Sequence, residues 1–158
     1  TGFGIENSVI LDLFAGTGSF SFEALSRGAS KATTVENSTI MIDLIYKNAE
    51  KLKFKDKIVI CEENACSFTV NSSDPKFDLV YCDPPYVPLS ATSNFTSYSK
   101  NDFGLEDQNL LARNAEKSKA KGIQCVISNH DLKITREMYR KSEIYEISVQ
   151  RKIAHQYY

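Results

Sequence analysis

The sequence predicts an α/β domain in which helices flank a doubly wound, mostly parallel β-sheet. Short apolar runs alternate with helical segments along the chain, and a glycine-rich turn follows the first run. Such alternation is typical of Rossmann-like sheets, whose strands are buried on both faces. With 158 residues, 42% hydrophobic and 25% charged, the composition fits one domain over residues 1–158.

Six apolar or β-branched runs are the expected strands. Each of the first five ends close to a polar or glycine-rich turn, and the sixth alternates between apolar and polar residues. In chain order, the expected strands are Val9–Phe14, Ala32–Glu36, Ile58–Cys61, Phe77–Cys82, Ile123–Ser128 and Ile144–Val149.

Helical segments are expected between these strands. Ser19–Arg27 is closed by Gly28, the residue type expected just past a helix end. Ser38 is the predicted cap of a second helix, whose expected apolar face is Met41, Leu44, Ile45, Ala49 and Leu52. The remaining expected elements are a short helix or turn at Ala65–Val70, a helix over 105–121 that ends at Gly122, and a short helix at Ile134–Arg140.

The distribution of charged, apolar and cysteine residues bears on which partners and which compartment we expect. Residues 1–109 hold 9 Lys and Arg against 15 Asp and Glu, whereas residues 110–158 hold 10 against 5, so the second part could meet phosphates or be a solvated helix surface. No apolar run approaches the ~20 residues that span a bilayer, and no leader opens the chain. The four cysteines (61, 66, 82, 125) lack CxxC spacing, so we expect reduced thiols, no metal site and a cytoplasmic protein. Separately, we expect the protein to be a monomer.

The first strand runs into the glycine turn, Phe14–Gly18. Gly16 and Gly18 let the backbone turn tightly and approach a ligand. Glu36 ends the second strand, where an acidic side chain can accept hydrogen bonds from ribose hydroxyls. Ser21 stands where the dinucleotide pattern has glycine, which disfavours NAD.

The tetrad Asp83–Tyr86 follows the fourth strand, at the edge where ligands gather in such sheets. The amine of a nucleobase is a poor nucleophile because its lone pair is delocalised into the ring. Asp83 and the Pro84 carbonyl could accept its two N–H bonds and free that lone pair, while Tyr86 offers a stacking face. The tetrad therefore predicts transfer to a nucleobase amine.

These residues resemble the class I S-adenosylmethionine-dependent methyltransferases that modify amino groups. LDLFAGTGSFSFEALSRGAS and FDLVYCDPPY are similar to the 16S rRNA guanine-N2 methyltransferases. DPPYVPLSATSNFTSYS, DQNLLA and VISNHDLKITREMYR are similar to the Dam-type DNA adenine-N6 methyltransferases. The resemblance implies the class I methyltransferase fold, S-adenosylmethionine as cofactor and a nucleic-acid substrate.

The resemblance also implies a role for particular positions. The tetrad Asp83, Pro84, Pro85 and Tyr86 would be catalytic, and Ser128, Asn129 and His130 would support it. The implied cofactor contacts are Asp12, Phe14, Ala15, Gly16, Thr17, Gly18, Glu36, Asn37, Asn64, Ala65 and Asp83.

The segments expected to touch the target base are the Dam-like ones, which favours adenine-N6 in DNA as the target. Guanine-N2 in 16S ribosomal RNA is the alternative, and a cofactor-binding core without turnover is a third possibility. The loop Val87–Asp102 carries two aromatic rings and a cation beside the tetrad. We expect the substrate contacts to be Tyr86, Phe95, Tyr98, Lys100 and Asn129.

Overall fold

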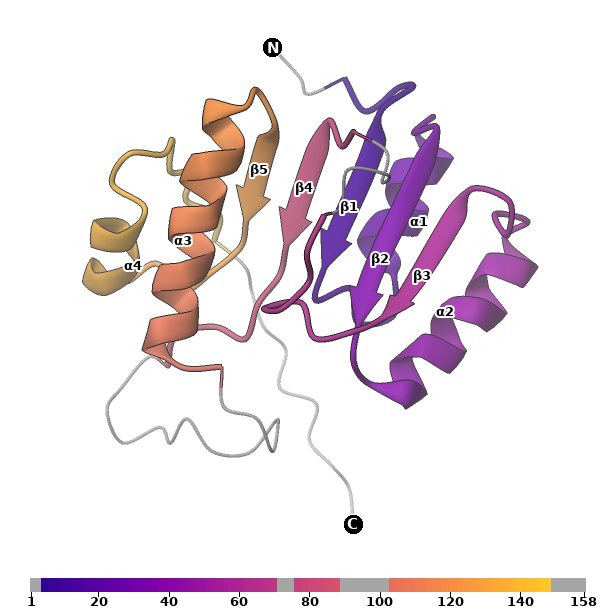
Figure 1. The fold of residues 1–158 in the computed structure, drawn as a ribbon, viewed down its shortest axis with the longest axis horizontal. Coiled ribbons are helices and arrows are strands. Elements are labelled where there is room, and N and C mark those ends of the chain that lie inside the picture. The colour runs from indigo at the N-terminus through magenta and orange to yellow at the C-terminus, as the bar shows by residue number, and fades with distance from the viewer. Residues whose placement is uncertain (1–3, 71–75, 89–102, 149–158) are drawn as a thin grey trace.

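The protein is described by a computed structural model that covers residues 4–70, 76–88 and 103–148. Within these residues, five parallel strands form one sheet in the order β3-β2-β1-β4-β5, and their arrows point the same way in Figure 1. The strands are β1 (Val9–Leu13), β2 (Lys31–Glu36), β3 (Ile58–Glu62), β4 (Leu79–Cys82) and β5 (Gln124–Ile127). The predicted doubly wound α/β fold is confirmed.

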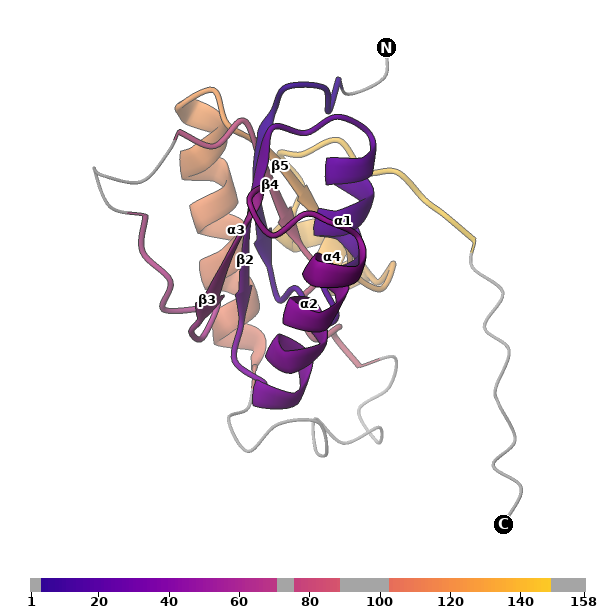
Figure 2. The same ribbon diagram turned by 90° about the vertical axis from the view of Figure 1, so that its right-hand side faces the viewer.

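Helices cover both faces of the sheet. The helices α1 (Ser19–Ser26) and α2 (Thr39–Lys51) lie on one face, and α3 (Leu105–Ala120) lies on the other (Figure 2). The short helix α4 (Lys133–Met138) follows β5 and lies beside α3. No helix in the described ranges is both long and apolar enough to cross a bilayer.

The core lies on both sides of the central strand β1. Ile10 packs with Ala24, Leu25 and Ala32 beneath α1, whereas Leu11 packs with Val35 and Phe77 on the opposite face. Consecutive residues of β1 are buried on opposite faces, which is why this strand does not alternate between apolar and polar residues and is apolar at all positions but Asp12.

The predicted sixth strand is wrong. Residues 143–148 form no strand in the structure, and Val149 lies outside the described residues. The side chains of Tyr145 and Ile147 are 74% and 79% exposed. Alternation specifies two faces, but a strand also needs a hydrogen-bonded neighbour, and β5 pairs with β4 alone among the described strands.

The buried face of α2 also differs from the prediction. The helix buries Ile42, Ile45 and Ala49, whereas Leu44 and Leu52 are exposed. Ile45 and Ala49 pack against Phe22 of α1, so the neighbouring helix fixes the orientation of α2 about its axis. Residues 65–67 form a turn, as one of the two alternatives for Ala65–Val70 anticipated.

Candidate active site

The glycine turn follows β1 at the carboxyl edge of the sheet. Gly16 and Gly18 adopt φ angles of 54° and 75°, and the Ala15 N–H donates to the Val35 carbonyl of β2 at 3.1 Å. A Cβ added at Gly18 would lie 3.0 Å from Phe22 Cε2, whereas one at Gly16 would have nothing within 4 Å. Gly18 therefore packs against α1, and the Gly16 backbone faces open space that a ligand can enter.

Glu36 lies directly beside this turn. Its Oε2 accepts the Gly16 N–H at 2.8 Å, and its Oε1 accepts the Asn37 and Ser38 N–H groups, each at 2.9 Å. A carboxylate oxygen has two lone pairs, so Oε2 can accept a further hydrogen bond. The structure thus brings together the acid and the turn that the sequence predicted to share a ligand.

Asp12 lies beneath the turn rather than on its surface. Its side chain is 1% exposed and accepts a hydrogen bond from Ser21 Oγ at 2.7 Å. Ser21, at the position where the dinucleotide pattern has glycine, is therefore the partner of a buried acid. Burial raises the pKa of Asp12 from 3.8 to about 6; the Ser21 hydrogen bonds lower it, and the Asp83 and Glu36 charges raise it. This geometry gives Asp12 a supporting role.

The buried Asp12 predicts a pH-dependent stability. Since burial raises the pKa of Asp12 in the folded protein, folding favours the protonated form of this residue. The contribution of the protonated form to the free energy of unfolding is fully present below about pH 4 and is lost as the pH rises through about 6. The loss is on the order of 2–3 kcal/mol. In Asp12→Asn, which retains an acceptor for Ser21, we expect a melting temperature above wild type at pH 8 and near wild type at pH 4. An equal difference at both pH values, measured by calorimetry, would contradict this assignment.

The tetrad begins where β4 ends. The Asp83 N–H lies 3.4 Å from the Leu13 carbonyl of β1, and Ser128 Oγ donates to Asp83 Oδ1 from the end of β5. The Ser128 N–H donates to the Cys82 carbonyl at 3.0 Å. Asp83 is exposed and Pro84 is buried. The hydrogen bond from Ser128 orients the Asp83 carboxylate, and the supporting role expected of Ser128 stays a prediction.

Backbone pairing brings the two predicted motifs to one edge. Leu13, the last residue of β1, pairs with Val35 of β2 and with Cys82 of β4. The glycine turn and Glu36 therefore lie on one side of the β1 end, and Asp83 lies on the other. The sheet changes winding direction between β1 and β4, which is the place where ligands bind in open α/β sheets.

Polar side chains behind the tetrad hold it in place. Asn129 was expected to contact the substrate, but its amide donates to Gln108 Oε1 at 3.0 Å and accepts from the Val87 N–H at 3.1 Å. This geometry favours support over substrate contact. Gln108 lies in the DQNLLA segment that carries the Dam-type resemblance, but the sequence alone assigned it no role.

Aromatic side chains border the site, and the sequence did not single out Phe20, Tyr81 or Phe103. The rings of Phe20 and Tyr81 are stacked, with centroids 3.9 Å apart and planes 14° apart. Burial raises the pKa of Tyr81, and the Asp83 charge raises it further, so this phenol lies near the tetrad. Phe14 contacts Phe103 edge to face, with centroids 5.3 Å apart. Periodicity assigned Phe20 and Tyr81 to core elements, and only tertiary packing reveals their pairing.

The other predicted contacts have simpler surroundings. Asn64 Oδ1 accepts the Cys66 N–H at 2.9 Å and so closes the 65–67 turn beside β3, with Ala65 half-buried. Thr17 Oγ1 and Ser19 Oγ lie 2.7 Å apart. Across the described ranges, no cluster of His, Cys, Asp and Glu could hold a metal ion. The predicted contacts outside the described residues are Phe95, Tyr98 and Lys100.

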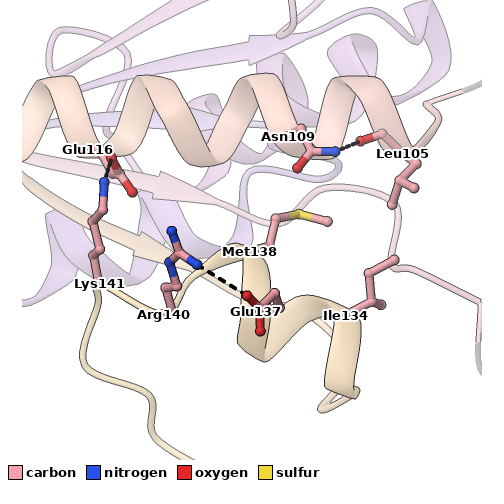
Figure 3. Close-up of a pocket in the computed structure, with 8 residues that line it drawn as sticks. All are labelled: Leu105, Asn109, Glu116, Ile134, Glu137, Met138, Arg140 and Lys141. Atoms are coloured by element: carbon pink, nitrogen blue, oxygen red, sulfur yellow. Dashed lines mark hydrogen bonds and ion pairs between the residues drawn. The ribbon is translucent and has the colours of Figure 1, made fainter.

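A pocket between α3 and α4 is separate from these motifs. Ion pairs join Lys141 to Glu116 at 2.9 Å and Arg140 to Glu137 at 3.2 Å along its wall (Figure 3). None of the residues predicted to bind cofactor or substrate lines this pocket. The full lining is Leu105, Asn109, Glu116, Ile134, Glu137, Met138, Arg140 and Lys141.

Comparison with known proteins identifies the family. The family described as conserved hypothetical protein 95 matches residues 2–145. The chain belongs to this family. Curated relatives of this family member include DNA adenine methylases from Escherichia coli strain K12, 43% identical over 110 residues, and Vibrio cholerae strain N16961, 46% identical over 96 residues.

The chain spans about a third of these relatives, 38% and 34% of their lengths, and they cover 70% and 60% of it. A solved structure from Haemophilus influenzae, described as a candidate methylase, covers 82% of the chain and is itself covered to 66%, with 26% identity and a TM-score of 0.57. This member of the conserved hypothetical protein 95 family has the class I methyltransferase fold. The resemblance to amino-group methyltransferases is confirmed.

Proposed function

We propose that this protein transfers a methyl group from S-adenosylmethionine to the exocyclic amine of a nucleobase, with adenine-N6 in DNA as the target. The observation that carries the proposal is the position of Asp83 and Pro84 across the end of β1 from the glycine turn and Glu36. This arrangement places groups suited to a ribose and groups suited to an amine on the two sides of one strand end.

The residues fit the cofactor. The open space at Gly16 leaves room for a ligand against the backbone, and Glu36 Oε2 retains acceptor capacity for a ribose hydroxyl. Asn37 follows Glu36, and Asn64 with Ala65 lies just past the end of β3 on the same edge. When bound, S-adenosylmethionine supplies an electrophilic sulfonium methyl group.

Tetrad residues would act on the target amine. The Asp83 carboxylate accepts one N–H of the amine, and the Pro84 carbonyl accepts the other. These two hydrogen bonds localise the lone pair on the amine nitrogen, which then acts as the nucleophile. Pro84 directly follows Asp83, and its ring holds the carbonyl in place beside that carboxylate. Tyr86, the last residue of the tetrad, is half-buried and offers its ring to the base. After transfer, the proton leaves to Asp83 or water.

DNA as the substrate rests on the curated relatives, which are named DNA adenine methylases. The chain spans about a third of those relatives, so DNA as its substrate is part of the proposal. The two targets differ in the methylated nucleoside that each would yield, so product analysis separates adenine-N6 in DNA from guanine-N2 in ribosomal RNA.

The test is incubation with radiolabelled S-adenosylmethionine and either duplex DNA free of N6-methyladenine or unmodified 16S ribosomal RNA. Digestion and chromatography then identify the modified nucleoside. We expect label in N6-methyladenine from DNA, and none with the Asp83→Ala variant, which controls for a contaminating host enzyme. Label in N2-methylguanine would replace the proposed target, and donor binding without any methylation would indicate a cofactor-binding core.

A further inference from the structure

The segment 83–88, which contains the tetrad, has too few backbone N–H groups to be held by backbone hydrogen bonds of the kind that join strands. Three of its six residues, Pro84, Pro85 and Pro88, have no N–H to donate. The Asp83 N–H points toward β1, which leaves the amides of Tyr86 and Val87 as the backbone donors of the segment. Side chains from elsewhere in the chain must therefore fix its path.

Two amide side chains supply these contacts. Gln108 of α3 donates from Nε2 to the Pro85 carbonyl at 2.7 Å and accepts at Oε1 from Asn129 Nδ2 at 3.0 Å. Asn129 in turn accepts the Val87 N–H at 3.1 Å. The amide clamp, defined as Gln108 and Asn129, thus holds the peptide groups immediately before and after Tyr86.

His130 extends the clamp to the tyrosine ring. The backbone N–H of His130 donates to Asn129 Oδ1 at 2.9 Å, and its ring Nδ1 lies 2.7 Å from the Val87 carbonyl oxygen. The imidazole meets the Tyr86 ring edge to face, with centroids 4.9 Å apart. The backbone on both sides of Tyr86 and the ring itself are therefore held by the same few residues.

Packing alone does not explain Gln108. The helix α3 buries two residues, Gln108 and Ala112, one turn apart, and Gln108 is 1% exposed. A buried amide costs free energy unless its hydrogen bonds are made, whereas an apolar side chain would fill the same space without that cost. The nitrogen and the oxygen of this amide are both hydrogen-bonded, to Pro85 and Asn129. These hydrogen bonds explain why a polar side chain is buried next to the tetrad segment.

We propose that Gln108 is a positioning residue for methyl transfer, which acts through Asn129 and the Pro85 carbonyl to fix the Pro84 carbonyl and the Tyr86 ring. This proposal rests on the proposed function of the tetrad. A displacement of about 1 Å in a group that orients the reacting atoms lowers a rate by as much as ~100-fold. The contribution of Gln108 is therefore expected in the transfer step and not in donor binding.

Gln108→Glu tests this role because the two side chains have the same shape. A protonated glutamic acid can donate to the Pro85 carbonyl and accept from Asn129, whereas the ionised form cannot donate. Because position 108 is 1% exposed, burial should raise the pKa of the introduced carboxyl group above its ordinary value. Relative to wild type, we therefore expect the single-turnover rate to be at least roughly tenfold lower at pH 8, where this group is ionised, and to recover toward wild type at pH 6, where more of it is protonated. Taking the ratio to wild type removes the pH dependence that the two proteins share.

Gln124→Glu is the matched control, since Gln124 is exposed at the start of β5, at the opposite end from the tetrad. Its rate ratio to wild type should stay near one at both pH values. Calorimetry should give unchanged donor affinity for both variants. A Gln108→Glu ratio that does not change with pH, or a loss confined to donor affinity, would overturn the positioning role.

Amide hydrogen exchange provides a readout that needs no activity. In Gln108→Leu, the Val87 amide should exchange at least roughly tenfold faster than in wild type, while the Val35 amide in the core keeps its protection. Unchanged Val87 exchange would mean that Gln108 only packs, and the proposal would fail. If the wild-type protein methylates no base, the proposed function fails, and the exchange data still decide whether Gln108 holds the segment.

Discussion

Replacing Asp83 with alanine should lower the single-turnover rate of methyl transfer by roughly 10²–10⁴-fold while leaving donor affinity largely unchanged. Asp83 lies at the end of β4 and accepts a hydrogen bond from Ser128, across the β1 end from the glycine turn. The carboxylate is the expected acceptor for the target amine, so its loss acts on the chemical step. Rapid-quench kinetics with saturating donor and calorimetry of donor binding separate the two effects.

Asp78→Ala is a matched control at the opposite end of the same strand. Asp78 Oδ2 accepts the Val9 N–H at 2.8 Å, so this variant should lose some thermal stability and keep its transfer rate per folded molecule. If Asp83→Ala loses donor binding and turnover together, Asp83 belongs to the cofactor site and its assigned role is wrong.

Replacing Glu36 with alanine should weaken donor binding by about 10- to 150-fold, because hydrogen bonds to a charged group contribute about 1.5–3 kcal/mol. The variant also removes the acceptor for the Gly16 N–H, so affinity alone cannot assign the effect to the ribose. A donor analogue that lacks both ribose hydroxyls resolves this. Wild type should bind the analogue much more weakly than the donor, whereas Glu36→Ala should bind the two almost equally.

Glu62→Ala controls for charge at this edge of the sheet. Glu62 ends β3, pairs in register with Glu36 and is exposed. Its replacement should leave the affinity for donor and analogue unchanged. If Glu36→Ala still distinguishes donor from analogue as strongly as wild type, the ribose hydroxyls do not bind Glu36.

Features that lie within one short stretch of sequence could be predicted, because local spacing encodes them. The glycine turn and the tetrad each follow an apolar strand, and parallel strands bring their carboxyl ends to one edge. Glu36 could be placed from its distance along the chain, because the intervening helix has a regular length. The strands β1 to β5 and the four helices were predicted to within a few residues for the same reason.

Features that depend on packing between distant segments could not be predicted. Gln108 meets Pro85 across 23 positions of sequence and Asn129 across 21, and no periodicity marks such contacts. The partnership of Asp12 with Ser21 became visible only when α1 was packed on β1. The incorrect strand over 144–149 has the same origin, since alternation is local whereas a neighbouring strand is not.

The β1–β4 ladder has an evolutionary consequence. On one side of it lie β1, β2 and β3 with the glycine turn and Glu36, and on the other lie β4 and β5 with the tetrad and its amide clamp. The chain crosses from one side to the other once, between Glu62 and Leu79, where the described residues form no strand or helix. Genetic recombination within residues 63–70, which form no helix or strand, would exchange the amine-facing half of the domain without cutting either kind of element. Four register pairs, from Ile10–Leu79 to Leu13–Cys82, would have to remain compatible, together with the Phe20–Tyr81 stack and the packing of Phe77 on Leu11. Because the tetrad and its amide clamp both follow that interval, such an exchange would move them together.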